Sequence, residues 1–121
     1  MGRNTGTARI LRVALMAWVY LLIAGLFEIA WATAMKQSAG FTRLWPTLTM
    51  AGAMLASFAL LAIAMRSLPL GTAYAVWTGI GAVGAFAVGI AVNGEPVTVM
   101  RLAACGLIVA GLVLMKLSSP S

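Results

Sequence analysis

The chain has no histidine, one cysteine and only two acidic residues among its 121 residues. Without histidine and with a single thiol, a typical zinc site cannot be assembled, so no metal is expected. The lone Cys105 has no partner for a disulfide within the chain and is interpreted as a small packing residue. No nucleophile is paired with a base and no phosphate-binding loop is present, so the sequence indicates neither an enzyme nor a cofactor.

Charged residues are also scarce, at 8% of the chain, whereas hydrophobic residues make up 63% and fall in long runs. This composition is typical of membrane proteins and excludes an ordinary soluble core. A helix of about 20 residues crosses a bilayer core about 30 Å thick. Four runs reach that length, at residues 13–35, 44–65, 68–92 and 97–115. The sequence therefore predicts an all-α membrane protein with four transmembrane helices per chain.

The segments between these runs are too short to form an extramembrane domain, so residues 16–117 are predicted to be one four-helix transmembrane domain. Residues 1–15 are different, because arginines are mixed there with glycine, asparagine and threonine, and a disordered basic extension is expected. Residues 118–121 are expected to form a short tail. The first run is longer than the apolar core of a signal peptide and contains Glu28, so we interpret it as a retained span.

The eight basic residues lie near the ends of the runs, where they are expected to anchor the helices against lipid headgroups. No basic stripe is present, so nucleic acid is not an expected partner. Five of them lie at the end that carries both termini and three at the opposite end. Without residues 1–15 the balance is two against three. So weak a bias is compatible with insertion of the chain in both orientations.

Glu28 lies in the middle of the first run, whereas the other acidic residue, Glu95, lies in a turn and is interpreted as a solvated charge. An ionisable group at membrane depth costs at least ~2.5 kcal/mol and commonly marks an ion or substrate pathway. The alternative is a structural hydrogen bond between helices, but asparagine or glutamine would make that bond at lower cost. Glu28 is therefore the candidate for binding protons and substrate.

Two residues of the first run and one of the second are placed to surround Glu28. Gly25 and Trp31 lie three residues before and after it on the same helical face, where glycine leaves space and the indole can donate to a carboxylate. Ser57 lies at a similar depth in the second run. Its hydroxyl can bond the carboxylate or, alternatively, a carbonyl of its own helix. The face of the first run that carries Gly25, Glu28 and Trp31 is a candidate cavity wall.

Two aromatic residues of the third run, Tyr74 and Trp77, are also three residues apart. Each has a π face and a polar group, which suit a pocket for an organic cation. The alternative for each of them, and for Trp31, is a place in the aromatic belt at the membrane surface.

Small residues are frequent in the third and fourth runs. Glycine inside a helix lowers its stability by about 1 kcal/mol relative to alanine, so a bend or hinge is expected at Gly79, Gly81 and Gly84. In the fourth run Ala104 and Gly111 are seven residues apart and share a face. A contact between two copies of the chain would need such a face, because small residues let helices approach closely.

Three features together resemble the small multidrug resistance family of four-helix, proton-coupled exporters. They are the glutamate in the first span, the run KQSAGFTRLWP at residues 36–46, and PLGTAYAVWTGIG at residues 69–81. The resemblance covers almost the whole chain, from Met16 to Leu117. FEIAW at residues 27–31, with Ser57 and GTAYAVWT, is similar to the guanidinium-exporter branch of that family.

The resemblance implies an antiparallel, dual-topology dimer in which two copies of Glu28 face one pocket. It implies that Trp31 and Ser57 bond to these carboxylates. It also implies that Tyr74 and Trp77 line the pocket and that the fourth spans form much of the dimer contact. A homodimer is expected, and a heterodimer with a related chain stays open.

The activity that the resemblance implies is export of guanidinium across a bacterial cytoplasmic (inner) membrane in exchange for protons. A buried carboxyl group with a second one nearby can release a proton and take up a cation in its place. Two alternatives stay open at this point. One is a broader exporter of quaternary ammonium compounds and drugs with the same fold, and the other is a membrane subunit that transports nothing.

Overall fold

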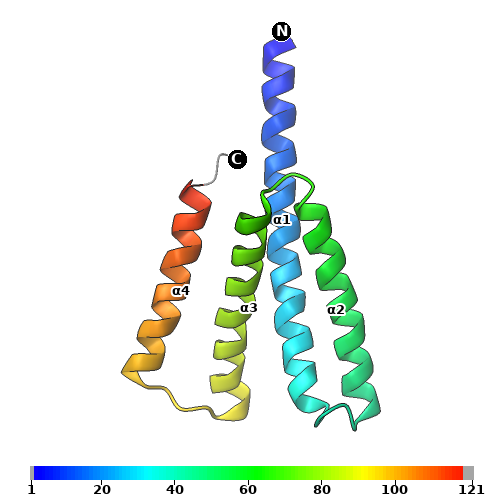
Figure 1. Ribbon diagram of the computed structural model, residues 1–121, viewed down its shortest axis with the longest axis vertical. Coiled ribbons are helices and arrows are strands. Elements are labelled where there is room, and N and C mark those ends of the chain that lie inside the picture. Colours follow the sequence, from blue (N-terminus) through cyan, green and yellow to red (C-terminus); the bar gives the residue numbers. More distant parts are fainter. Residues whose placement is uncertain (1, 119–121) are drawn as a thin grey trace.

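The computed structural model describes residues 2–118, with side chains from residue 6 onward. The four helices are α1 (Gly2–Gln37), α2 (Leu44–Ala64), α3 (Leu70–Asn93) and α4 (Val99–Ser118). Successive helices run in opposite directions, so both ends of the described chain point toward the same end of the molecule (Figure 1). Each helix is long and apolar enough to cross a membrane. The predicted all-α chain with four membrane-spanning helices is therefore confirmed.

The residues around Pro69 and Gly94 set the limits of α3. Pro69, which has no N–H to donate, precedes the first turn of the helix and acts as its N-cap. Gly94 adopts a left-handed conformation with φ of 65° directly after Asn93. Glycine reaches this conformation without steric cost and is the usual residue after a helix end.

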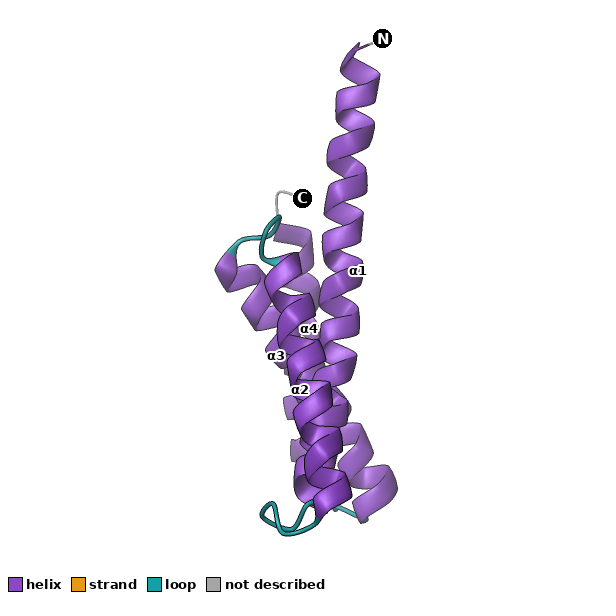
Figure 2. Cartoon of the chain, turned by 90° about the vertical axis from the view of Figure 1, so that its right-hand side faces the viewer, coloured by secondary structure: helices purple, strands orange, loops and turns teal. Residues whose placement is uncertain are grey.

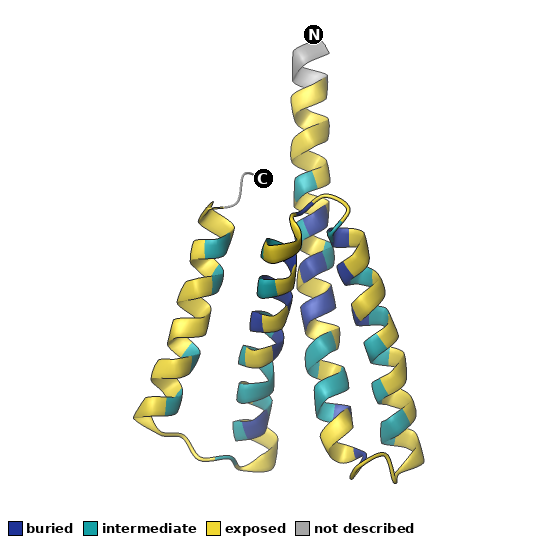
Figure 3. Cartoon of the chain, in the orientation of Figure 1, coloured by how far each residue is buried: buried dark blue, intermediate teal, exposed yellow. Residues whose placement is uncertain are grey.

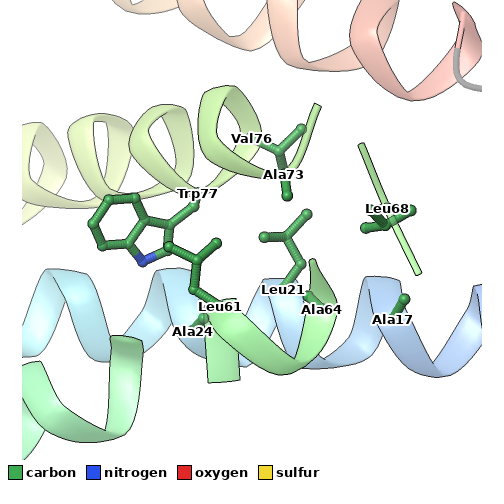
Figure 4. Packing of buried hydrophobic residues seen from close by; sticks show 9 residues of the cluster. All are labelled: Ala17, Leu21, Ala24, Leu61, Ala64, Leu68, Ala73, Val76 and Trp77. Atoms are coloured by element: carbon green, nitrogen blue, oxygen red, sulfur yellow. The ribbon is translucent and has the colours of Figure 1, made fainter. Parts of the chain in front are cut away.

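The hydrophobic core lies between α1, α2 and α3, toward the end of the bundle that carries the turn between α2 and α3 (Figure 3). The side chains of Leu21, Leu61 and Trp77 meet there, one from each helix (Figure 4). Alanines on the same faces keep the helices close, since small residues permit close approach within a membrane. The core consists of Ala17, Leu21, Ala24, Leu61, Ala64, Leu68, Ala73, Val76 and Trp77.

Helix α4 lies at the edge of this core, against which its residues Leu112 and Met115 pack. Its backbone approaches that of α3 only, and none of its residues is buried (Figure 3). One close contact is made where Leu112 lies against Gly79 of α3. The other faces of α4 are apolar and exposed, as expected of a helix that contacts lipid or a second protein chain.

The N-terminal segment differs from its prediction. Residues 1–15 were expected to be disordered, but α1 begins at Gly2 and continues without a break into the first span (Figure 2). Adding residues to an existing helix avoids the unfavourable nucleation step, and the alanine, leucine and arginine residues here are good helix formers. At the other end, Ser118 closes α4, and residues 119–121 of the predicted tail lie outside the described residues.

Candidate functional site

Glu28 lies within the membrane-spanning part of α1, and its carboxyl group packs on α3 at Gly81. A Cβ atom at Gly81 would lie only 2.8 Å from Glu28 Oε1 and nearer still to the other carboxyl atoms. Only glycine therefore permits this contact. The carboxyl group is half-buried and rests against the bare backbone of α3.

Two further glycine contacts lock α1 to α3 on either side of Glu28. Gly25 of α1 receives the side chain of Ile80, and Gly84 of α3 receives the side chain of Ile29. Each glycine thus makes room for a branched side chain of the neighbouring helix. These contacts hold Glu28 at a defined depth and rotation relative to α3.

The glycines of α3 that were predicted to form a hinge have a packing role in this structure. Gly79 faces Leu112, Gly81 faces Glu28 and Gly84 faces Ile29. Helix α3 is continuous from Leu70 to Asn93 through all three. The hinge stays a prediction about motion, since glycine weakens a helix even where it is packed.

Ser57 joins three helices. Its hydroxyl donates a hydrogen bond of 2.7 Å to the carbonyl oxygen of Ala24 in α1 and accepts one of 2.9 Å from the indole Nε1 of Trp77 in α3. The side chain is fully buried in α2. A buried hydroxyl that donates and accepts in this way is satisfied, and loss of either partner would leave a polar group unpaired.

Within one chain, the hydroxyl of Ser57 does not bond Glu28 as the sequence suggested, because its proton goes to Ala24. The bond to Ala24 nevertheless links Ser57 to Glu28 through the backbone of α1. Ala24 is four residues before Glu28, so in a regular helix its carbonyl also accepts the backbone N–H of Glu28. Ser57 therefore holds the turn of α1 on which the carboxylate is carried.

Trp31 does not bond Glu28 within one chain either. Its Nε1 and the Oε2 atom of Glu28 are both shielded from solvent and have no hydrogen-bond partner among the described residues. Trp31 itself is half-buried on the same face of α1. A shielded donor or acceptor without a partner is costly unless another group bonds to it. The oxygen of Glu28 can therefore take up a cation or a proton, and the indole N–H of Trp31 can take up an acceptor.

Trp77 anchors an aromatic cluster next to Ser57. Its ring centre lies 5.4 Å from that of Tyr74 and 5.7 Å from that of Phe58, with tilted and edge-on geometry respectively. Trp77 is buried in the core, which is not the setting of an interfacial belt residue, whereas Tyr74 is 53% exposed. Sequence reasoning missed Phe58, because consecutive residues of a helix do not share a face and its position after Ser57 gave no signal of this contact.

Two cavities border α4, and Glu28 lines neither. The larger, of about 410 Å³, lies between α1, α3 and α4 beside Trp18 and Lys116, and the smaller, of about 230 Å³, lies between α3 and α4 beside Phe86 and Arg101. Their walls are almost wholly apolar. A single chain therefore does not enclose Glu28 in either of these hollows.

The residues predicted to form the dimer contact are uncovered. Ala104 is exposed and borders the smaller cavity, and Gly111 is exposed with open space where its Cβ would be. Both therefore leave room for the close approach of another helix. Contact between two copies at these residues stays a prediction.

Comparison with known proteins adds to this geometry. Residues 16–108 match the sequence model of the family described as Small Multidrug Resistance protein. Similar proteins named Guanidinium exporter occur in Citrobacter freundii, Salmonella typhimurium and Escherichia coli (strain K12). Each is 56% identical over 104 residues, which span 86% of this chain and 99% of the relative.

Proposed function

The chain belongs to the small multidrug resistance family, and on this premise we propose that it exports guanidinium across a bacterial inner membrane in exchange for protons. The observation that carries the proposal is the placement of Glu28. Its carboxyl group lies at membrane depth on a glycine of α3 and keeps one shielded oxygen without a partner among the described residues. The relatives named as guanidinium exporters support the choice of substrate.

Guanidinium suits this site for chemical reasons. It is a planar cation whose paired N–H groups match the two oxygens of a carboxylate, so one ion can make two parallel hydrogen bonds to Glu28. Gly81 leaves a flat surface beside the carboxyl group. The aromatic faces of Trp77 and Tyr74 lie on the same helix and add attraction for a cation that has lost its water.

The working unit of the proposal is an antiparallel dimer with two copies of Glu28 facing one pocket. Two observations support it: α4 has no buried residue, and neither cavity bordering α4 contains Glu28. A second copy inserted in the opposite direction would cover the exposed faces of α4 and the face of the chain that carries Glu28. The partner is a second copy of this chain or a related chain of opposite orientation. In such a dimer the indole of Trp31 has a second carboxylate within reach as an acceptor.

Exchange follows if protons and guanidinium compete for the same carboxylates. The protonated form and the guanidinium-loaded form can each change the side to which the pocket opens, whereas the empty, charged form cannot. The flux of protons is therefore coupled to the flux of guanidinium. The movement is a rocking of two copies around a fixed site, with α3 as the flexible element. No covalent chemistry is required.

Transport by purified protein in liposomes tests the proposal against both alternatives. We expect proton-coupled flux with guanidinium and none with the Glu28→Gln variant. A preference for bulky quaternary ammonium ions would favour the broader drug exporter. Absence of flux with either class, from protein that is folded and reconstituted, would favour a membrane subunit that transports nothing.

A further inference from the structure

The helical extension at the start of α1 is not used by the proposed transport mechanism. The family match begins at residue 16, so the preceding segment lies outside the region shared with the family. In this structure it continues α1 in a straight line past the turn between α2 and α3 (Figures 1 and 2). Helix α1 has 36 residues, or about 54 Å at 1.5 Å per residue, whereas a bilayer core is about 30 Å thick.

The distance of the arginines of this extension from the membrane can be estimated from the position of the hydrophobic core of the bundle. Ala17 belongs to the core cluster with Ala64 and Leu68, which flank the turn between α2 and α3. Arg12 lies five residues before Ala17, about 7.5 Å further along the helix, and Arg9 lies about 12 Å further. The headgroup layer on each side of a bilayer is about 5–8 Å thick. With Ala17 taken as the edge of the acyl-chain layer, Arg12 lies at the outer edge of the headgroup layer, and Arg9 lies about 4 Å further out, from where its long side chain can extend back to the headgroups.

Other basic residues lie at the same end. Lys116 of α4 places its ammonium group 4.4 Å from the ring centre of Trp18, one residue after Ala17. Arg66 lies in the turn between α2 and α3. The two acidic side chains lie elsewhere. Glu28 is in the membrane-spanning part of α1. Glu95 forms an ion pair of 3.3 Å with Arg101 at the opposite end of the bundle.

Two exposed apolar residues lie between these arginines. Ile10 and Leu11 are 69% and 59% exposed, and Arg9 and Arg12 are also exposed. Basic side chains this close to a bilayer are attracted to anionic headgroups, since the attraction extends over about one Debye length, roughly 8–10 Å. The helix fixes the distance of both arginines from the bundle, which a segment without regular structure would not do.

We propose that Arg9 and Arg12 of this extension bind the anionic headgroups of the cytoplasmic leaflet and thereby make one orientation of the chain, with both ends of the described chain on the cytoplasmic side, the more abundant. The partner of this surface is anionic lipid. With the extension, basic residues number five against three in favour of this end, and without it two against three. A homodimer of antiparallel chains would then be limited by the less abundant orientation.

Cell-free synthesis in the presence of vesicles tests this proposal. Single cysteines at Ser67 and Gln37, which are exposed at opposite ends of the bundle, report orientation in a Cys105→Ala background. Ser38 is unsuitable because it is fully buried. An impermeant maleimide labels the cysteine on the side of synthesis, and the ratio of the two labels gives the ratio of orientations. Vesicles contain phosphatidylcholine alone or mixed with phosphatidylglycerol.

With phosphatidylglycerol we expect the N-terminal end to remain mainly on the side of synthesis. The Arg9→Gln/Arg12→Gln variant should lower the orientation ratio at least about fivefold, because each basic residue near an anionic surface contributes about that factor. The Arg9→Lys/Arg12→Lys variant keeps the charge and should match the unchanged protein. Vesicles of phosphatidylcholine alone should reduce the difference between the variants.

Three results would overturn the proposal. These are equal orientations in the unchanged protein, equal ratios for the glutamine and lysine variants, and a ratio that does not respond to phosphatidylglycerol. Guanidinium flux, measured separately after reconstitution, does not enter this ratio. Failure of guanidinium transport would therefore count against the proposed function and leave the orientation result standing.

Discussion

The bundle of α1, α2 and α3 and the outlying helix α4 are packed in opposite ways. In the bundle, glycines on one helix receive side chains from another, and Ser57 ties three helices together through two hydrogen bonds. In α4 no residue is buried, and Gly106 and Gly111 face open space. The first region positions a carboxylate within one chain, whereas the second has an uncovered surface, which suits contact between chains.

The largest effect should come from the carboxylate at the centre of the packed region. Glu28→Gln keeps the size of the side chain and its hydrogen bonding but removes its charge and its exchangeable proton, so coupled guanidinium transport should be lost completely. Glu28→Asp should retain coupling with a changed pH dependence. Flux in liposomes measures both, and the dimer should persist in each variant. Proton-driven guanidinium flux in the Gln variant would contradict the central role of Glu28.

The next effect should come from the glycine that holds this carboxylate. Gly81→Val places a branched side chain where the carboxyl group of Glu28 lies, so we expect loss of at least about 1 kcal/mol of stability, as for an overpacked core, and of most transport. Gly71→Val is the matched control, because Gly71 lies in the first turn of the same helix and has open space where its Cβ would be. Thermal unfolding and flux would be measured together. Equal behaviour of the two variants would show that the Gly81 contact is unimportant.

Ser57→Ala should have an intermediate effect. It removes both hydrogen bonds and leaves the indole N–H of Trp77 buried without its partner, at a cost of about 1–3 kcal/mol in the free energy of unfolding. Thr49→Ala, an exposed hydroxyl in the same helix, should change stability by much less. Denaturation in detergent compares the two. If Ser57→Ala were as stable as the control, the link between the three helices would not matter.

Trp31→Gly should alter selectivity more than stability. Trp31 is only half-buried, and its indole N–H has no partner among the described residues. Its removal enlarges the space beside Glu28, so guanidinium flux should fall while larger hydrophobic cations are admitted. Parallel flux assays with guanidinium and a quaternary ammonium ion measure the ratio. An unchanged protein that already prefers the quaternary ammonium ion, with a ratio that Trp31→Gly does not alter, would point to the broader drug exporter.

The smallest effect on the single chain is expected in α4. Gly111→Leu meets open space, so the fold of the chain should hardly change, and any loss should appear in the association of two chains. Gly106→Leu is a matched control on a different face of the same helix, also in open space. Crosslinking or dimer dissociation in detergent separates the two variants. Equal dimer stability in both would remove Gly111 from the predicted contact.

Sequence reasoning reached the candidate site but not its hydrogen bonds. Glu28 could be identified because a charge within an apolar run is conspicuous at any helix rotation. The partners of Ser57 could not, because whether its hydroxyl meets Glu28 or the carbonyl of Ala24 depends on the depth and rotation of α2 against α1. Phe58 was missed for the same reason. Its contact with Trp77 exists only once α2 and α3 are brought together.

The amino-acid sequence by itself determined the four spans and the single carboxylate within them, because hydropathy and charge are properties of local composition. Tertiary structure decided which glycines receive which side chains, since Gly81 and Gly84 look alike in the sequence but face Glu28 and Ile29. The continuation of α1 through residues 2–15 is instead a local property, because an existing helix extends more readily than a new one forms. Contacts between elements depend on geometry that no single segment contains.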